Sequence, residues 1–128
     1  MKKSFILFLA IALIGISTSF VQAADFDRVI INSEKWTDVY SGVHYANLNN
    51  VGSNFVVSPS HARTILNEIN TGNTIKPLSS QDSPYAFNYQ SLIESTGFNT
   101  SDEIVSRNLN IELAEEMENV TNFVVVSD

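Results

Sequence analysis

Short apolar runs recur along the chain after residue 24, separated by segments with a different spacing of apolar residues. Three of these runs, residues 29–31, 55–57 and 104–105, consist of Val, Ile and Phe and are typical of buried strands. Residues 123–126 form a fourth such run. Residues 74–85 predict a weaker strand, because Pro77 is poorly placed in the middle of a sheet.

Between these runs, apolar residues recur three and four positions apart, which is the spacing of one helix face. The first predicted helix buries Trp36, Val39, Tyr40 and Val43, and the pattern continues to Ala46 and Leu48. The second has Ser58 as its cap, Pro59 in its first turn, and apolar residues at Ala62, Ile65, Leu66 and Ile69. The third contains Tyr89, Leu92 and Ile93 and ends at Gly97; the fourth contains Ile111, Ala114 and Met117, with Asn110 as its cap.

Strands that alternate with helices predict right-handed βαβ units and a parallel sheet covered on both faces. We therefore expect an α/β fold with an open, doubly wound, mostly parallel sheet of the flavodoxin or Rossmann kind. No linker or repeat divides residues 24–128, which predicts a single module. The last strand has no covering helix after it, so we expect a domain that is incomplete at its C-terminus.

The first 23 residues have the features of a secretory signal peptide. Lys2 and Lys3 precede an apolar run over residues 5–16, and residues 21–23 (VQA) suit cleavage after Ala23. The alternative is a retained membrane anchor, since the run approaches the length of a span. Cleavage is favoured because the apolar core is short and no basic cluster follows, and it predicts an extracellular or cell-surface protein.

Removal of residues 1–23 from the 128 leaves 105, enough for one hydrophobic core. The formal charge moves from −7 to −9, because Lys2 and Lys3 are both lost. Such an acidic surface disfavours nucleic acid and anionic lipid as partners. The chain also lacks Cys, so burial, bound ions or neighbouring molecules must stabilise it.

Motifs for the common catalytic and cofactor sites are absent from the sequence. The glycines form neither GxGxxG nor GxxxxGK[ST], no GxSxG elbow occurs, and no HxH or HExxH spacing is present. We therefore predict no cofactor, no metal site and no catalytic residue. His44 is expected to be partly buried in the first helix, and His61 to lie at the start of the second.

In an open parallel sheet, ligands bind beyond the carboxyl ends of the strands. This rule points to residues 32–38, 58–61, 79–83, 106–108 and 127–128. Asp38, with Glu34, could accept a proton or bind a cation there, although an acidic residue in the first turn also favours the helix dipole. Trp36 and Tyr40 could form a platform for sugar rings, although their spacing fits core packing as well.

Two Asn-x-Ser/Thr triplets begin at Asn99 and Asn119, and an exported protein can carry N-linked glycans at such sites. These triplets are weak signals in a chain that is rich in Asn, Ser and Thr. The glutamates at 112, 115, 116 and 118 predict a solvated helix face.

Residues 29–42 (VIINSEKWTDVYSG), followed by 43–48 and 54–58 (NFVVS), resemble the cell wall-binding repeat 2 family. Asp38, Ser41 and Gly42 match the family's Asp-Ala-Leu-Ser-Gly/Ala segment, whereas Val39 and Tyr40 replace its usual Ala-Leu. FVV at 55–57 replaces the Ile-Leu-Leu portion that bacterial members use to bind polymer. The resemblance is closer to divergent versions in archaeal surface-layer-like proteins.

The resemblance implies a non-catalytic module that anchors to, or helps build, a cell wall or surface layer. Its ligand or surface-binding residues would be Trp36, Asp38, Tyr40 and Ser41, and its partners envelope components, sister modules or copies of itself. Bacterial members bind anionic wall polymers, which the charge of this chain disfavours. Two alternatives remain at this stage: an exported domain that binds a sugar or a cation, and the N-terminal fragment of a secreted hydrolase.

Overall fold

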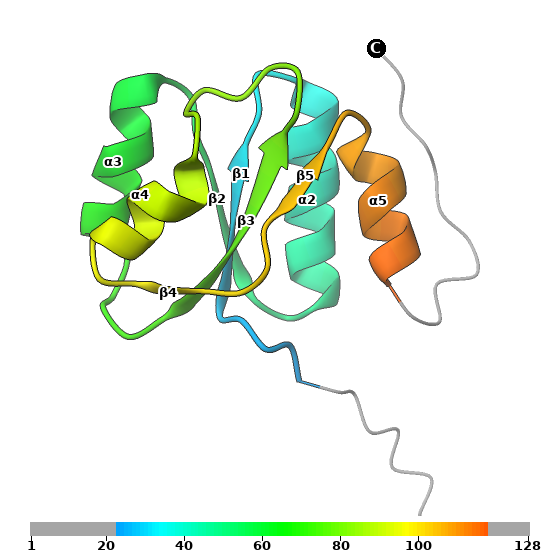
Figure 1. Cartoon of the computed structure of the whole chain (residues 1–128). Coiled ribbons are helices and arrows are strands. Elements are labelled where there is room, and N and C mark those ends of the chain that lie inside the picture. Colours follow the sequence, from blue (N-terminus) through cyan, green and yellow to red (C-terminus); the bar gives the residue numbers. More distant parts are fainter. Residues whose placement is uncertain (1–22, 118–128) are drawn as a thin grey trace, which may run out of the picture.

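A parallel sheet of five strands forms the centre of the molecule (Figure 1). The computed structural model describes residues 23–117, so residues 1–22 of the predicted signal peptide and the predicted strand 123–126 lie outside the described residues. The strands are β1 (Arg28–Asn32), β2 (Gly52–Phe55), β3 (Thr74–Ser80), β4 (Asn99–Thr100) and β5 (Ile104–Ser106). Their order is β2-β1-β3-β4, with β5 also paired to β3, and all pairs are parallel.

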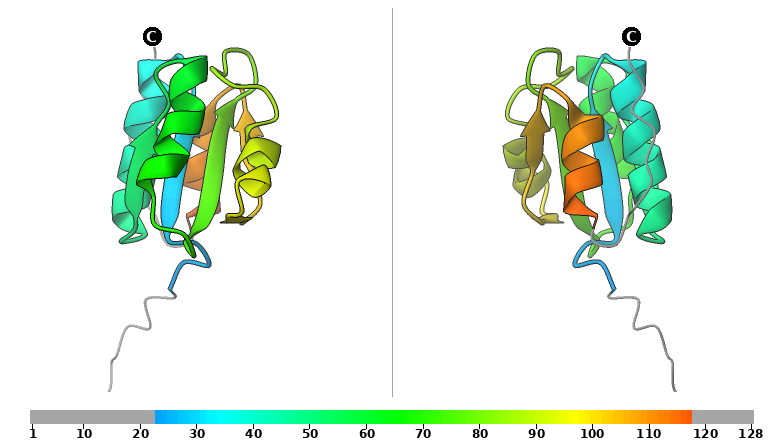
Figure 2. Two further views of the ribbon diagram at one scale, coloured as in Figure 1. Left: turned by 90° about the vertical axis from the view of Figure 1, so that its left-hand side faces the viewer. Right: turned by 90° about the vertical axis from the view of Figure 1, so that its right-hand side faces the viewer.

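Four helices cover the two faces of this sheet. Figure 2 shows α3 (Pro59–Glu68) and α4 (Tyr89–Ser95) on one face, and α2 (Trp36–Leu48) and α5 (Leu109–Glu116) on the other. Successive residues of β1 point to opposite faces, so Ile30 packs under α3 and α4, whereas Val29 and Ile31 pack under α2 and α5. The predicted open, doubly wound α/β fold is therefore confirmed.

Strand positions agree with the sequence pattern at β1 and β5 and differ at three other places. Strand β3 ends at Ser80, before the predicted end at residue 85. The second strand begins at Gly52 and ends at Phe55, earlier than the predicted 55–57. The short strand β4 was not predicted, because the two polar residues Asn99 and Thr100 give no apolar signal.

Pro77 lies inside β3, in the middle of the sheet, and the sheet is built around it. Ile75 O accepts a hydrogen bond from Ser101 N (3.0 Å), so the alternate residue Pro77 faces the same neighbouring strand. That neighbour is interrupted opposite Pro77, because β4 ends at Thr100 and β5 begins at Ile104. The N–H that proline lacks is therefore not needed.

Helix α3, the second helix along the chain, matches its prediction closely. Ser58 accepts a hydrogen bond from His61 N at 3.1 Å as the cap, and Ala62, Ile65 and Leu66 are buried. Helix α5, the fourth helix along the chain, differs from its prediction. Its N-cap residue is Asn108, its buried residues are Leu109 and Leu113, and Ile111 is exposed. The prediction of Asn110 as cap and Ile111 as core was therefore wrong in register.

Helices α2 and α5 are tied together near their C-terminal ends. The Tyr45 hydroxyl donates to Glu116 Oε2 (2.7 Å), and Lys76 Nζ, almost completely buried, lies 3.0 Å from Glu116 Oε1. Burial, together with the bond to Glu116, raises the pKa of Tyr45. This contact also shows which side of α2 faces α5, namely the side that carries Tyr45.

Candidate functional site

Polar residues at the ends of two strands, β1 and β3, meet at the carboxyl edge of the sheet, where the sequence analysis expected a ligand site. The chain leaves β1 toward α2 on one face and leaves β3 toward α4 on the other, so a topological switch point lies between them. Asn32, Ser33, Ser79 and Ser80 lie there and are all buried. We call this region the carboxyl edge.

Asn32 holds the connection from β3 to α4 across the switch point. Its Nδ2 donates to Ala86 O (2.7 Å) and to Ser79 Oγ (3.1 Å), and its Oδ1 accepts from Ala86 N (3.0 Å). A second bond joins Glu34 N to Ser83 O at 2.9 Å. Ser79 donates in turn to Glu103 Oε1 at 2.6 Å. The polar groups of the strand ends are thus bonded to one another and to the chain's own loop.

Asp38 belongs to this interior and not to the surface. Its carboxylate accepts a 2.6 Å hydrogen bond from Ser33 Oγ, and Ser33 Oγ accepts one from Lys35 N. Because only 3% of Asp38 is exposed, its carboxylate orders the first turn of α2 and is not presented to a dissolved cation. The structure therefore separates Asp38 from Trp36 and Tyr40, with which the resemblance grouped it.

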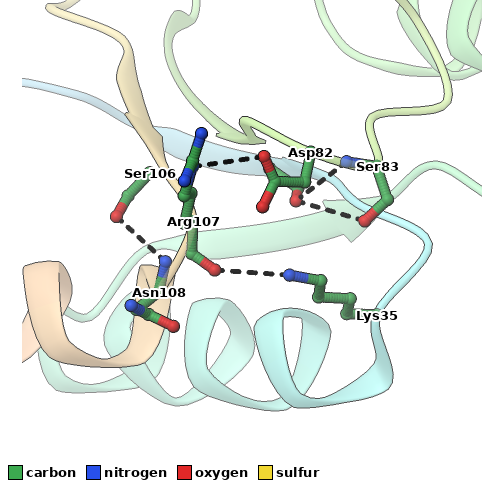
Figure 3. A network of polar contacts seen from close by, with 7 residues as sticks. Lys35, Asp82, Ser83, Ser106, Arg107 and Asn108 are labelled. Carbon is green, nitrogen blue, oxygen red and sulfur yellow. Dashed lines mark hydrogen bonds and ion pairs between the residues drawn. The ribbon is translucent and has the colours of Figure 1, made fainter.

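A rim of polar contacts surrounds the carboxyl edge (Figure 3). Lys35 Nζ donates to Arg107 O at 3.3 Å, and Arg107 Nε lies 3.3 Å from Asp82 Oδ1. Both side chains of that ion pair are half exposed or more, so the pair contributes only about 0–1 kcal/mol. These contacts link the loops that follow β1, β3 and β5.

Trp36 and Tyr40 are exposed, contrary to the expectation that both lie on the buried side of the first helix. Trp36 is 59% exposed and Tyr40 58%, and the residues of α2 that are buried are Thr37, Asp38, Gly42, Tyr45 and Ala46. Trp36 lies nine residues from Tyr45, about two and a half turns, so it projects away from α5. Tyr40 follows one turn later on the same side and stacks parallel to His44, with ring centroids 6.4 Å apart.

Helix α2, which carries these aromatic residues, packs against β2, the outermost strand on that side of the described sheet. Phe55 is 46% exposed and Val57 52%. Phe55 is paired with Ile31 and so points to the face that α2 covers. We call the exposed side chains of Trp36, Tyr40, Phe55 and Val57, with the open edge of β2, the β2 flank.

Few charged residues lie on the β2 flank, although the Arg28 guanidinium of the neighbouring strand donates a 2.6 Å hydrogen bond to Asn54 Oδ1 on β2. Residues 39–62 contain no Asp, Glu, Lys or Arg, and the nearest preceding charged residue, Asp38, is buried. This run of 24 uncharged residues, 39 to 62, could have indicated an exposed apolar surface from the sequence alone, whereas the helical spacing of Trp36 and Tyr40 predicted that they are buried. It matters because the chain as a whole carries a formal charge of −7.

Comparison with known proteins adds no relative on which to place these surfaces. No family model, curated protein or solved structure matches the chain. The choice between the carboxyl edge and the β2 flank therefore depends on their geometry and charge.

The two histidines lie apart, one on each of two helices. His44 is exposed, so the expectation of a partly buried imidazole was wrong. His61 lies in the first turn of α3, where its Nδ1 accepts a 3.3 Å hydrogen bond from Val57 N. Over residues 23–117, no three His, Asp or Glu side chains are grouped as a metal ion would require.

Three further predicted features concern the surface of the chain. Asn99 is exposed on β4, whereas Asn119 lies outside the described residues. Ser41 is half-buried on α2. Among the helices of residues 23–117, none is long and apolar enough to cross a membrane.

Proposed function

We propose that this chain is an exported, non-catalytic module that attaches to, or helps build, a cell wall or surface layer through its β2 flank. The observation that carries the proposal is the exposure of Trp36, Tyr40, Phe55 and Val57 on α2 and at the end of β2, where residues 39–62 contain no Asp, Glu, Lys or Arg. Large apolar side chains that are exposed favour a partner that covers them. Aromatic side chains contribute most to such contacts, because each removes a large apolar area from water.

The carboxyl edge supports a binding module over an enzyme in one respect. A catalytic base or nucleophile needs a hydrogen-bonding atom directed at the substrate. At the carboxyl edge these atoms bond to the chain itself: Asn32 bonds to Ala86, Ser33 to Asp38, and Ser79 to Glu103. The polar groups that topology brings together thus maintain the fold.

Charge narrows the class of partner. With a formal charge of −9 after removal of residues 1–23, the chain would be repelled by an anionic wall polymer. The β2 flank instead suits an uncharged surface, such as a protein of the layer or the faces of neutral sugar rings. The similarity of residues 29–42 to divergent surface-layer-like members of the cell wall-binding repeat 2 family supports the same role.

Cell fractionation tests the proposal. The full chain, produced in its native cells, should be recovered with the envelope, and the double variant Trp36→Ala/Tyr40→Ala should be released into the medium. Leu48→Ala is the matched control, because Leu48 is 50% exposed on the same helix but lies three residues after Tyr45, on the side toward α5. The control should stay in the envelope fraction.

Recovery of the wild-type protein only from the medium would contradict a surface role. Equal release of the double variant and the Leu48→Ala control would contradict the assignment of that role to the β2 flank.

A further inference from the structure

We infer that the partner covering the β2 flank is a second copy of this chain, which pairs its own β2 antiparallel to the first across a two-fold axis. This inference rests on the proposed function and names the partner for the same surface. It makes one continuous sheet from two molecules.

The backbone of β2 has its outer donors and acceptors in place. Val56 N donates to Ile31 O at 2.8 Å. The backbone N–H and C=O groups of residues 52, 54 and 56 therefore point toward β1, and those of residues 53, 55 and 57 point outward. His61 Nδ1 already accepts from Val57 N. Within residues 23–117, the outward N–H and C=O groups of Ser53 and Phe55 have no backbone partner, so a new strand can bond to them.

A two-fold axis at Asn54 satisfies these groups in one step. It places Ser53 opposite Phe55 of the partner subunit, and each such pair exchanges both of its backbone hydrogen bonds. A two-fold contact uses the same surface on both molecules, as the closed symmetry of most dimers requires.

The opposite edge of the sheet shows how this chain protects a strand that does not pair. Strand β4 has two residues, the strand is interrupted before β5, and the interruption carries Asp102 and Glu103. Short strands, interruptions and charges all hinder edge-to-edge pairing. Strand β2 is twice as long, with four residues, pairs in continuous register with β1 and contains only Gly, Ser, Asn and Phe.

Charge favours a second copy at this place and opposes it elsewhere. Two molecules with a formal charge of −9 each repel one another over most of their surfaces. The stretch 39–62 carries no Asp, Glu, Lys or Arg, so the acidic groups that cause this repulsion are absent from β2 itself. The Arg28 guanidinium lies on β2 with its hydrogen bond directed to Asn54 Oδ1 of the same molecule. Phe55 and Val57, about half exposed in one molecule, then lose their contact with water.

Sedimentation equilibrium of the exported protein over a wide concentration range tests the inference. The wild type should be a dimer, and Phe55→Lys should weaken dimerisation by about tenfold or more, roughly 1.4 kcal/mol. Ser53→Pro should do the same, because it removes an outward donor that β1 does not use. Val105→Lys is the control, since Val105 is 54% exposed on β5 at the protected edge, and it should remain dimeric.

Amide hydrogen exchange provides a second readout at the proposed contact. The amides of Ser53 and Phe55 should exchange slowly in the wild type, and the amide of residue 53 quickly in Phe55→Lys. Circular dichroism and urea unfolding should show that each variant is folded, so that loss of the dimer is not loss of the fold.

A wild type that is monomeric at every concentration overturns the inference, as does a dimer that survives both Phe55→Lys and Ser53→Pro. A monomer that is still retained in the envelope through Trp36 and Tyr40 would leave the proposed function standing and reject only the second copy as partner. Dissociation of Val105→Lys to the same extent as Phe55→Lys would reject β2 as the contact.

Discussion

The carboxyl edge and the β2 flank exchange the roles that their sequences predicted. The edge combines Asn32, Ser33 and Ser79, residue types common in binding sites, yet these side chains are buried and bond to the chain itself. The flank combines Trp36 and Tyr40, whose spacing fits a buried helix face, yet both are more than half exposed. Topology determines which polar groups meet, whereas their own hydrogen bonds determine whether they can serve a ligand.

Charge separates the two regions further. The rim of the carboxyl edge contains Lys35, Asp82 and Arg107, which contact one another and the neighbouring backbone. The β2 flank takes most of its residues from the uncharged stretch 39–62, and the charged group bonded to β2 is the Arg28 guanidinium, which contacts Asn54. We therefore expect substitutions at the carboxyl edge to change the stability of the fold, and substitutions on the β2 flank to change binding to a partner.

The largest effect is expected for Asn32→Ala. Asn32 is completely buried, and its loss leaves the N–H and C=O of Ala86 and the Ser79 hydroxyl without this partner. Buried groups that lose a hydrogen-bond partner cost about 1–3 kcal/mol each, so unfolding by urea should become easier by roughly 3 kcal/mol.

Asn47→Ala is the control for that experiment, because Asn47 is exposed on α2. It should change the free energy of unfolding by no more than about 0.5 kcal/mol. Equal urea midpoints for Asn32→Ala and the wild type would show that the carboxyl edge does not stabilise the fold, and would reopen it as a ligand site.

Gly42→Ala should have an intermediate effect and act on the flank side. A Cβ at position 42 would collide with the Ile31 side chain and approach Leu78 Cδ1 to 3.3 Å, so α2 must move away from the sheet. Overpacking of this kind costs about 1–3 kcal/mol. Replacing glycine in a helix returns about 1 kcal/mol, so we expect a net loss of roughly 1–2 kcal/mol in the free energy of unfolding.

Amide exchange at Ala86 distinguishes the two substitutions. Protection at Ala86 should persist in Gly42→Ala, where Asn32 still accepts its hydrogen bond, and should be lost in Asn32→Ala. The neighbouring change Ser41→Ala, at a half-buried residue, should leave stability within about 0.5 kcal/mol of the wild type. Loss of Ala86 protection in Gly42→Ala would mean that the two regions are coupled through α2.

Much of the fold could be predicted because its signals are local. Runs such as 29–31 mark buried strands, and Ser58 with Pro59 marks the start of α3. Strand β3 was uncertain for a local reason, Pro77, whose acceptance depends on an interruption in a strand more than 20 residues away. The sequence does not distinguish Asn108 from Asn110 as the N-cap of α5, and Asn108 occupies that position without a capping hydrogen bond from its side chain.

The candidate site was harder to predict, because exposure is set by neighbours distant in sequence. Trp36 and Tyr45 are aromatic residues on opposite sides of α2, and the contact of Tyr45 with Glu116 on α5 shows which side is covered. Likewise, nothing in the sequence around Asn32 predicts that its side-chain amide will bond to the backbone of Ala86. The absence of charge over 39–62 was readable, but its meaning depends on α2 and β2 lying together at one side of the sheet.

The smallest effect on stability is expected for the double variant Trp36→Ala/Tyr40→Ala. Both side chains are more than half exposed, and alanine has the higher helix propensity, so the free energy of unfolding should fall by no more than about 1 kcal/mol. Tyr45→Ala, an aromatic residue on the buried side of the same helix, should cost about 3 kcal/mol or more in the same urea titration. If the double variant is as unstable as Tyr45→Ala, the two aromatic residues belong to the core and the β2 flank is not a binding surface. A stable double variant that is released from the envelope would assign binding to the flank, because a side chain that contributes little to folding but much to retention must act on a partner.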